Sequence, residues 1–177
     1  MNKLFVLLFS FLTIILLLNT SCVAQDKIEV KYKKEYNSFE KNGIEKKINS
    51  SNFTANDIIS TAKSFIGTPH CMGGSTKKCM DCSGLILRTY KTFGIDLPHN
   101  SQEQARYGKP IFDKTKLQKG DFVFFTNTYR TSAFITHSGI YLGDGTFIHT
   151  STKAGVTITQ LDAIYWKDRF VFGTRVF

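Results

Sequence analysis

Three side chains in this sequence have the types and spacing needed for covalent catalysis. Cys82 lies at the predicted start of a helix, and His137 and His149 are two of four histidines in the chain. The free amide groups and the dipole at a helix start stabilise a thiolate, so we expect the pKa of Cys82 to fall from about 8.5 toward neutrality. A nucleophilic cysteine also needs a base that a third group orients. The three residues therefore predict nucleophilic cysteine chemistry.

The two histidines flank a predicted hairpin. Residues 143–145 read Gly-Asp-Gly between two runs of alternating apolar residues, which is typical of a β-hairpin. With these three residues as the loop, His149 faces Gly139 and His137 faces Ser151. The histidines then share one sheet face as diagonal neighbours roughly 7–8 Å apart. A two-residue loop would place them on opposite faces.

Apolar spacing predicts helices first and strands afterwards. One helix should begin near Phe53, with Thr54 or Asn56 as its cap, and stop at residues 67–69. A second should run over residues 82–93. Short β-branched and aromatic runs follow at 122–125, 138–142, 146–150, 156–158 and 170–177. This order predicts an α+β fold with N-terminal helices packed on a central antiparallel β-sheet.

The chain begins with the features of an export signal. Lys3 precedes an apolar run over residues 4–18, which is shorter than the roughly 20 residues of a bilayer span. Small or polar residues then lead to Cys22, which resembles a bacterial lipoprotein signal. We therefore expect an exported protein that is lipid-anchored to a bacterial cell membrane, facing the periplasm or the cell surface. The expected parts are a lipoprotein signal peptide over 1–21, lipidated Cys22 with a polar tether over 22–52, and one domain over 53–177.

Residues 23–52 are rich in Lys, Glu, Asn and Ser without a sustained period, as expected of a solvated tether. The short apolar pieces at Ile28, Val30 and Tyr32 could instead dock as a strand. The formal net charge of +9 suits a polyanionic envelope. Because residues 31–34 are the only dense basic block, we expect no nucleic-acid partner.

Short motifs in order along the chain resemble the NlpC family of papain-like cell-wall cysteine peptidases. They are Gly67-Thr68-Pro69, Gly73-Gly74, Asp81-Cys82-Ser83-Gly84, Gly94-Ile95 with Leu97-Pro98, Ser101-Gln102, Gly120-Asp121 with Phe124-Phe125, His137-Ser138-Gly139-Ile140-Tyr141, and Ile148-His149. The resemblance covers about residues 55–177. It implies a papain-like core that hydrolyses amide bonds in peptidoglycan stem peptides, typically the γ-D-glutamyl bond to diaminopimelate or lysine.

By this resemblance, Cys82 is the nucleophile, His137 the general base and His149 the residue that orients the base. The thiolate would attack the amide carbonyl, His137 would give a proton to the leaving amine, and water would hydrolyse the thioester. Backbone amides at the start of the Cys82 helix would stabilise the oxyanion. The resemblance implies no metal and no other cofactor.

The resemblance also implies substrate-binding residues. Asp81, Ser83 and Ser101 match positions that contact the substrate, notably the free amine of a stem that begins with L-alanine. His70 stands where relatives commonly carry tyrosine. An imidazole there can donate a hydrogen bond to the oxyanion or the substrate, and a plain surface histidine is the alternative.

Two further cysteines lie in the loop before the nucleophile. In an exported protein, Cys71 and Cys79 can form a disulfide that pins this loop, and two separate thiols are the alternative. A zinc quartet of His70, Cys71, Cys79 and Cys82 is the least favoured hypothesis, because adjacent His70 and Cys71 point apart in an extended chain. We therefore expect no metal.

Two other functions stay open. One is a non-catalytic cell-wall-binding lipoprotein, against which the intact Cys82, His137 and His149 argue. The other is a papain-like acyl transferase or lipid amidohydrolase, against which the lack of a large hydrophobic insertion argues. The expected partners are peptidoglycan stem peptides or muropeptides and, through the lipid anchor, a membrane. We expect a monomer.

Overall fold

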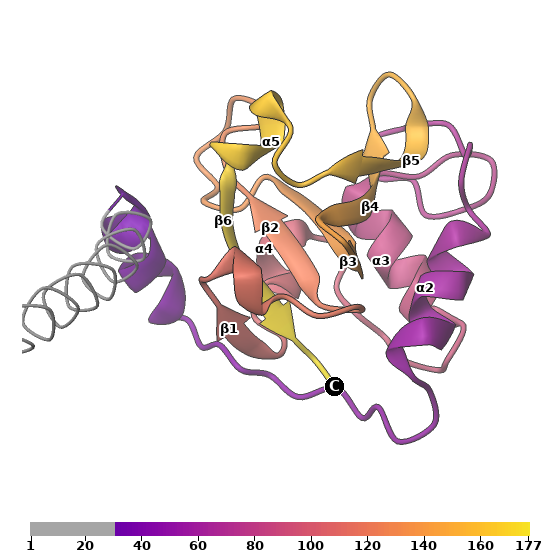
Figure 1. Cartoon of the computed structure of the whole chain (residues 1–177), viewed down its shortest axis with the longest axis horizontal. Coiled ribbons are helices and arrows are strands. Elements are labelled where there is room, and N and C mark those ends of the chain that lie inside the picture. Colours follow the sequence, from indigo (N-terminus) through magenta and orange to yellow (C-terminus); the bar gives the residue numbers. More distant parts are fainter. Residues whose placement is uncertain (1–30) are drawn as a thin grey trace, which may run out of the picture.

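A six-stranded antiparallel sheet forms the centre of the protein in a computed structural model that describes residues 31–177. Its strands lie in the order β1-β6-β2-β3-β4-β5 (Figure 1). The predicted signal peptide and Cys22 fall outside the described residues. The strands are β1 Lys109–Ile111, β2 Phe122–Phe125, β3 His137–Gly143, β4 Thr146–Ser151, β5 Gly155–Gln160 and β6 Phe170–Arg175.

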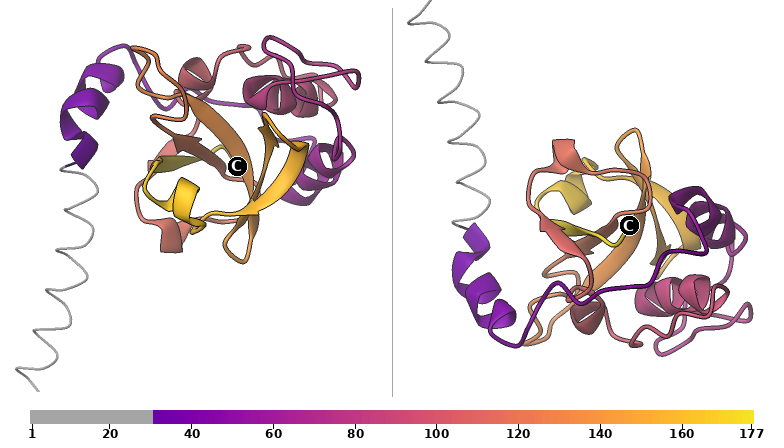
Figure 2. Two further views of the ribbon diagram at one scale, coloured as in Figure 1. Left: turned by 90° about the horizontal axis from the view of Figure 1, so that it is seen from above. Right: turned by 90° about the horizontal axis from the view of Figure 1, so that it is seen from below.

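Two helices, α2 and α3, lie together beside the sheet (Figure 2). Helix α2 begins where Thr54 accepts a hydrogen bond from the Asp57 amide and the Asp57 carboxylate accepts one from the Thr54 amide, which is a capping box. The α+β fold with helices packed on an antiparallel sheet is thus confirmed. The helices are α2 Ala55–Lys63, α3 Cys82–Lys91, α4 Ser101–Gln104 and α5 Ile164–Lys167, with a 3₁₀ turn, η1, at Lys114–Lys116.

Both faces of the sheet are buried. The larger apolar cluster includes Leu85 and Ile86 of α3 together with Ile140 and Ile148 of the sheet. A smaller cluster on the other face is formed by Leu117, Val123, Phe125, Tyr141, Phe147, Leu161 and Phe170, with Trp166 of α5 packed against it. Because strand side chains alternate between faces, consecutive residues of β3 pack in different clusters: Ile140 belongs to the larger one and Tyr141 to the smaller one.

Residues 31–40 form a helix where the sequence suggested a solvated tether or a docked strand. Tyr32, Tyr36 and Phe39 recur at helical spacing and pack against the larger cluster, and Phe39 is only 4% exposed. The guanidinium of Arg106 donates to the carbonyl oxygens of Phe39 and Gly43 at 2.8 and 2.9 Å. Packing of these three aromatic side chains on the core thus stabilises a helix in a segment of mostly polar composition.

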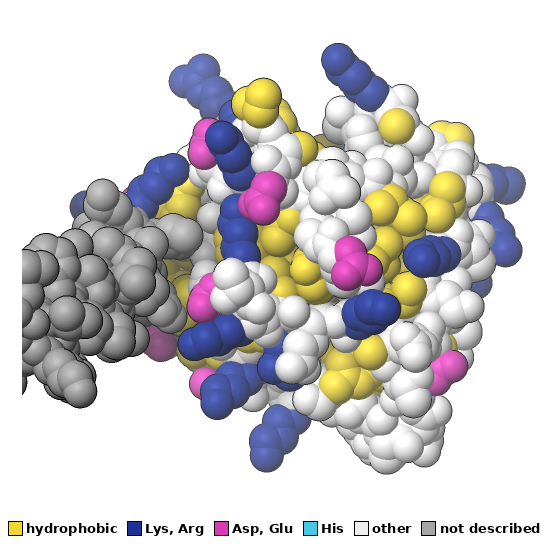
Figure 3. All heavy atoms as spheres, viewed as in Figure 1, with side chains coloured by type: hydrophobic (Ala, Val, Ile, Leu, Met, Phe, Trp, Pro, Cys, Tyr) yellow, Lys and Arg dark blue, Asp and Glu magenta, His cyan; other side chains and the backbone are white. Residues whose placement is uncertain are grey.

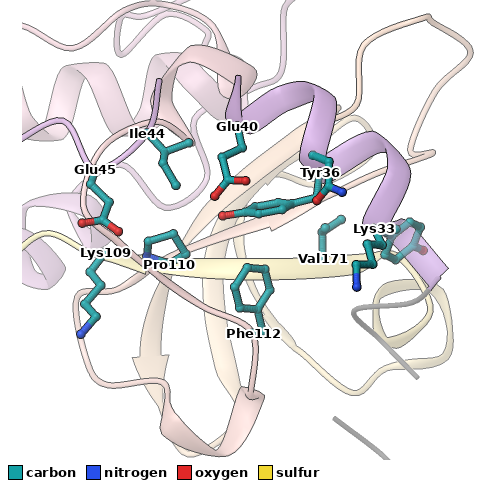
Figure 4. Close-up of a pocket in the computed structure, with 11 residues that line it drawn as sticks. Lys33, Tyr36, Glu40, Ile44, Glu45, Lys109, Pro110, Phe112 and Val171 are labelled. Atoms are coloured by element: carbon teal, nitrogen blue, oxygen red, sulfur yellow. The ribbon is translucent and has the colours of Figure 1, made fainter. Parts of the chain in front are cut away.

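A cavity of about 350 Å³ lies between helix 31–40 and the β1–β6 edge (Figure 4). Its lining contains neither cysteine nor histidine, so nucleophilic cysteine chemistry must lie elsewhere. It is lined by Tyr32, Lys33, Tyr36, Asn37, Glu40, Ile44, Glu45, Lys109, Pro110, Phe112 and Val171.

On the face shown in Figure 3, lysine and arginine side chains are spread among apolar areas and do not gather into one patch. Among residues 31–177, no helix is both long enough and apolar enough to cross a membrane.

Candidate active site

Cys82 is the first residue of α3. The preceding residue, Asp81, caps the helix, because its Oδ1 atom accepts a hydrogen bond from the amide of Gly84 at 2.7 Å. The Asp81 carbonyl accepts a hydrogen bond of 3.1 Å from the Thr150 hydroxyl on β4. The cap and this cross-link hold the nucleophile candidate where the helix start meets the sheet.

The thiol of Cys82 lies in a network of hydroxyl groups. Its Sγ atom is 3.4 Å from Ser101 Oγ, which is 3.0 Å from Ser138 Oγ. Gln104 anchors this side by donating to the carbonyls of Ser83 and Pro98, both at 2.9 Å. Ser101 therefore lies beside the nucleophile candidate, and its contact with substrate stays a prediction.

The predicted fall in the pKa of Cys82 is wrong. The residue is half-buried, and loss of water around its sulfur raises the pKa of the thiol above its usual value. Hydrogen bonds from Ser101 and Ser138 lower the pKa, but they do not compensate, and the Asp81 charge adds to the rise. The position at a helix start predicted too low a pKa, because the burial of the thiol depends on residues outside that helix.

The two histidines meet on one face of the sheet, with His137 Nε2 3.0 Å from His149 Nδ1. Strands β3 and β4 pair Ile140 with Ile148, which is the register that the sequence predicted. The turn itself differs from that prediction.

The tip of the hairpin has two residues, Asp144 and Gly145, both with positive φ, in place of the three-residue loop. Such a turn would shift the two histidines to opposite faces, but the pairing of Gly143 with Thr146 includes a register shift after Tyr141. This bulge adds one residue to β3 and restores the predicted alignment.

The hydrogen bonds of the two rings fit two arrangements of the ring protons. His149 Nε2 lies 3.0 Å from Thr159 Oγ1, so in one arrangement the His149 ring donates to Thr159 while its Nδ1 accepts from His137 Nε2–H. In the other arrangement Thr159 donates to His149, and His149 donates to His137. The first arrangement leaves the Nδ1 atom of His137 unprotonated and is the one in which His137 Nδ1 can act as a base.

Burial also keeps both imidazoles neutral. It lowers the pKa of His137 to about 4, although the Asp81 charge opposes this change. Burial and then the neighbouring His137 lower the pKa of His149 to about 2. Trp166 supplies part of the cover, with its ring centroid 5.0 Å from that of His137 and 4.7 Å from that of His149.

Among residues 31–177, no direct hydrogen bond joins Cys82 and His137. They are linked through Ser138, which directly follows His137 and hydrogen-bonds the thiol through its backbone amide and its hydroxyl. Catalytic hydrogen bonds are often long before the substrate binds. The raised pKa of Cys82 and the lowered pKa of His137 both favour the neutral forms of the two groups.

The other predicted substrate-binding residues divide into two groups. Asp81 and Ser83 lie at the start of α3 with Ser101, and the Ser83 hydroxyl donates to Asp81 Oδ1 at 2.9 Å. His70 is half-buried and forms a backbone bridge to Met80, but among residues 31–177 its imidazole has no hydrogen-bond partner. The structure therefore assigns no contact that supports the proposed role of His70.

Cys71 and Cys79 are joined by a disulfide, with Cα atoms 5.5 Å apart. The loop that it closes touches the active site, because the Gly73 amide donates to Asp81 Oδ2 at 2.7 Å and the Asp81 amide donates to the Gly74 carbonyl at 3.0 Å. Both sulfur atoms are used in this bond, so the alternative zinc quartet does not form here.

Sequence reasoning missed two residues of the site. His99 places Nε2 3.0 Å from Asp81 Oδ1, and Trp166 covers the histidine pair. Two weak signals were present: His99 is one of four histidines and stands two positions before Ser101, and Trp166 is the single tryptophan of the chain. Neither signal indicates which distant residues His99 and Trp166 contact.

Comparisons with known proteins match this site and fold. The NlpC/P60 family matches residues 67–175, which is more than half of the chain. The murein DD-endopeptidase MepS/murein LD-carboxypeptidase of Escherichia coli K12 is 40% identical over 111 residues, 62% of this chain and 56% of that protein. The gamma-DL-glutamyl hydrolase of Bacillus subtilis 168 is 38% identical over 122 residues, 68% of this chain and 29% of that protein.

A solved structure supports the same assignment. The crystal structure of an NlpC/P60 family protein from Bacillus cereus ATCC 10987 has a TM-score of 0.63 and 34% identity, and the match covers 70% of this chain and 40% of that one. The chain thus spans about half or less of the length of these relatives. From the matched residues and the shared fold, the chain belongs to the NlpC/P60 family.

Proposed function

We propose that this protein is a cysteine endopeptidase that hydrolyses amide bonds in the peptide stems of peptidoglycan. The observation that carries the proposal is the 3.0 Å contact between His137 and His149. The residue after His137 on strand β3 is Ser138, which hydrogen-bonds the Cys82 thiol. Membership of the NlpC/P60 family and the names of both curated relatives support this chemistry.

The directions of the two pKa shifts favour the following order of proton transfers. His137 Nδ1 takes the thiol proton as Cys82 Sγ attacks the amide carbonyl, and the C–N bond then breaks as His137 gives that proton to the leaving amine. Water attacks the thioester, His137 takes a proton from it, and the thiol leaves as the carboxylic acid forms. The free amides in the first turn of α3 are the oxyanion donors.

The scissile bond that we propose is the γ-D-glutamyl bond to diaminopimelate or lysine. The name of the B. subtilis relative, a gamma-DL-glutamyl hydrolase, supports it. The name of the E. coli relative, a murein DD-endopeptidase, favours a second candidate, a bond between two D-configured centres. Both candidates use the same thioester chemistry and differ in where the stem lies on the enzyme.

We also propose that the protein is anchored to a bacterial cell membrane through a lipid on Cys22 and faces the periplasm or the cell surface. The apolar run over residues 4–18 and the small or polar residues before Cys22 support this location. Labelling cells with a radioactive fatty acid tests it. Label in the wild type that is lost in Cys22→Ala supports lipidation, and label that persists in Cys22→Ala contradicts it.

Mass analysis of products from defined muropeptides tests the proposed activity. The wild type should release new amino groups at one bond, and the product masses distinguish γ-D-glutamyl cleavage from D,D cleavage. Cys82→Ala should release none, whereas Ser64→Ala, a change of an exposed residue at the end of α2, should retain activity. Release of amino groups by Cys82→Ala, or none by the wild type, would contradict the proposal. Binding to sacculi without turnover would favour a wall-binding protein, and release of fatty acid from lipid esters would favour an acyl hydrolase.

A further inference from the structure

Asp81 is an ionised carboxylate directly beside the nucleophile, and its side chain is only 10% exposed. It accepts hydrogen bonds from the amides of Gly73 and Gly84, both at 2.7 Å, and from the Ser83 hydroxyl at 2.9 Å. Burial raises its pKa, but these hydrogen bonds, led by that of Gly84, and the one from His99 hold the pKa below its usual value. Such a carboxylate would attract a substrate ammonium group.

His99 is the fourth partner of this carboxylate. Its Nε2 atom lies 3.0 Å from Asp81 Oδ1, and its side chain is 28% exposed. The other side-chain partner, Ser83, is 6% exposed. Among residues 31–177, Oδ1 takes the contacts of Ser83, Gly84 and His99, and Oδ2 accepts only that of Gly73. His99 is therefore the more exposed of the two side chains that occupy Oδ1.

The position of His99 is built into the site. Ser101, two residues later, contacts the Cys82 sulfur, so one short segment touches both Asp81 and the nucleophile. A Cβ atom on Gly84 would lie 3.1 Å from His99 Nε2. The absence of a side chain at Gly84 leaves the space that this imidazole uses.

We propose that His99 is a specificity-determining residue that covers Asp81 and directs the site to stem peptides whose first residue is N-acylated. This inference rests on the proposed peptidase function. A free ammonium group can pair with Oδ1 of Asp81 only by displacing His99, because that oxygen already has three partners. An N-acylated residue, as in a stem still joined to a glycan strand, carries no positive charge at its amine and does not form an ion pair with Asp81.

The outer nitrogen of His99 fits such a substrate. Among residues 31–177, the Nδ1 atom has no hydrogen-bond partner. In a neutral ring that donates through Nε2 to Asp81, Nδ1 accepts a hydrogen bond, and in a charged ring it donates one. A secondary amide offers both an N–H and a carbonyl, so an acylated terminus can bind in either state. A terminal ammonium group offers only donors.

Paired substrates test the inference. We would measure kcat/KM for one stem peptide, containing the bond cleaved in the muropeptide assay, with its terminal L-alanine either free or N-acetylated. The wild type should prefer the acetylated form. His99→Ala uncovers Asp81 and should shift the ratio toward the free amine by about tenfold or more, roughly the effect of one charged contact. His99→Gln, whose amide can still donate to Asp81, should keep a ratio near that of the wild type, as should the control Ser64→Ala at an exposed site at the end of α2.

The outcomes separate this inference from the proposed function. If His99→Ala lowered kcat/KM equally for both peptides, His99 would only support the structure and the inference would be wrong. A wild-type preference for the free amine would also overturn it, whatever the folding of the variants. If the wild type cleaved neither peptide and no muropeptide, the proposed peptidase function would itself fail.

Discussion

His137 Nε2 lies 3.0 Å from His149 Nδ1, and the Trp166 ring covers both imidazoles. Thr159 completes the chain of hydrogen bonds at the far side of His149. These contacts fit the tautomer of His137 that leaves its Nδ1 atom free to take a proton. The orientation of one histidine by another gives the first prediction.

His149→Ala should lower kcat by roughly 10²–10⁴-fold, because His137 loses the group that sets its tautomer and angle. KM should change little, since His149 is buried and does not face the substrate. Steady-state kinetics on a muropeptide would measure both constants. Thr159→Val, which leaves both imidazole rings in place, is the matched control and should lower kcat much less than His149→Ala does. A His149→Ala enzyme within tenfold of wild-type kcat would rule out the orienting role.

The buried histidines should also make the fold sensitive to acid. The pKa of His137 is lowered from 6.5 to about 4, so between these values the unfolded chain binds more protons than the folded one. The free energy of unfolding should therefore fall as the pH drops from 6.5 toward 4, by about 3 kcal/mol for this group alone. The lowered pKa of His149 acts in the same direction.

Urea unfolding at pH 7 and pH 4.5 would check this dependence. His137→Gln should lose much less stability over this range than the wild type, because glutamine does not titrate. His70→Gln removes a histidine outside the buried pair and should behave like the wild type. Equal losses in His137→Gln and the wild type would show that other groups cause the acid sensitivity.

Ser101→Ala should make the Cys82 thiol less reactive. The Ser101 hydroxyl, 3.4 Å from the sulfur, lowers the pKa of a thiol that burial raises, so its loss should raise that pKa further. The rate of alkylation by iodoacetamide at neutral pH should fall severalfold. The control is Ser64→Ala, since the exposed Ser64 hydroxyl bonds only to the Thr61 carbonyl. An unchanged alkylation rate would mean that Ser101 does not stabilise the thiolate.

Replacing both Cys71 and Cys79 by serine should weaken the loop before the nucleophile. A disulfide that closes a loop of this length contributes roughly 2–3 kcal/mol by restricting the unfolded chain. The same loop donates the Gly73 amide to Asp81, so kcat/KM should also fall. Thermal unfolding and muropeptide kinetics would measure the two effects. Dithiothreitol should lower the unfolding temperature of the wild type and leave the variant unchanged, and equal responses would contradict a structural disulfide.

Much of the scaffold could be predicted because its signals are local. The helix over Ala55–Lys63 and the strands of the second half follow from side-chain periodicity, and the capping box of Thr54 with Asp57 lies within four residues. Short elements were missed. Strand β1 and helix α5 have three and four residues, too few for a period to show, and α5 carries Trp166 into the site.

Sequence alone determined the chemical types and their order: a cysteine at a helix start, two histidines in hairpin register, and the motifs of the family. These depend on spacings of a few residues and on the strict alternation of side chains along a strand. Only the tertiary structure decided which groups meet and how they ionise. His99 reaches Asp81 across 18 residues, and the pKa values of Cys82 and His137 shift through burial by segments distant in the chain. Desolvation is a property of the assembled core, so no local pattern could reveal it.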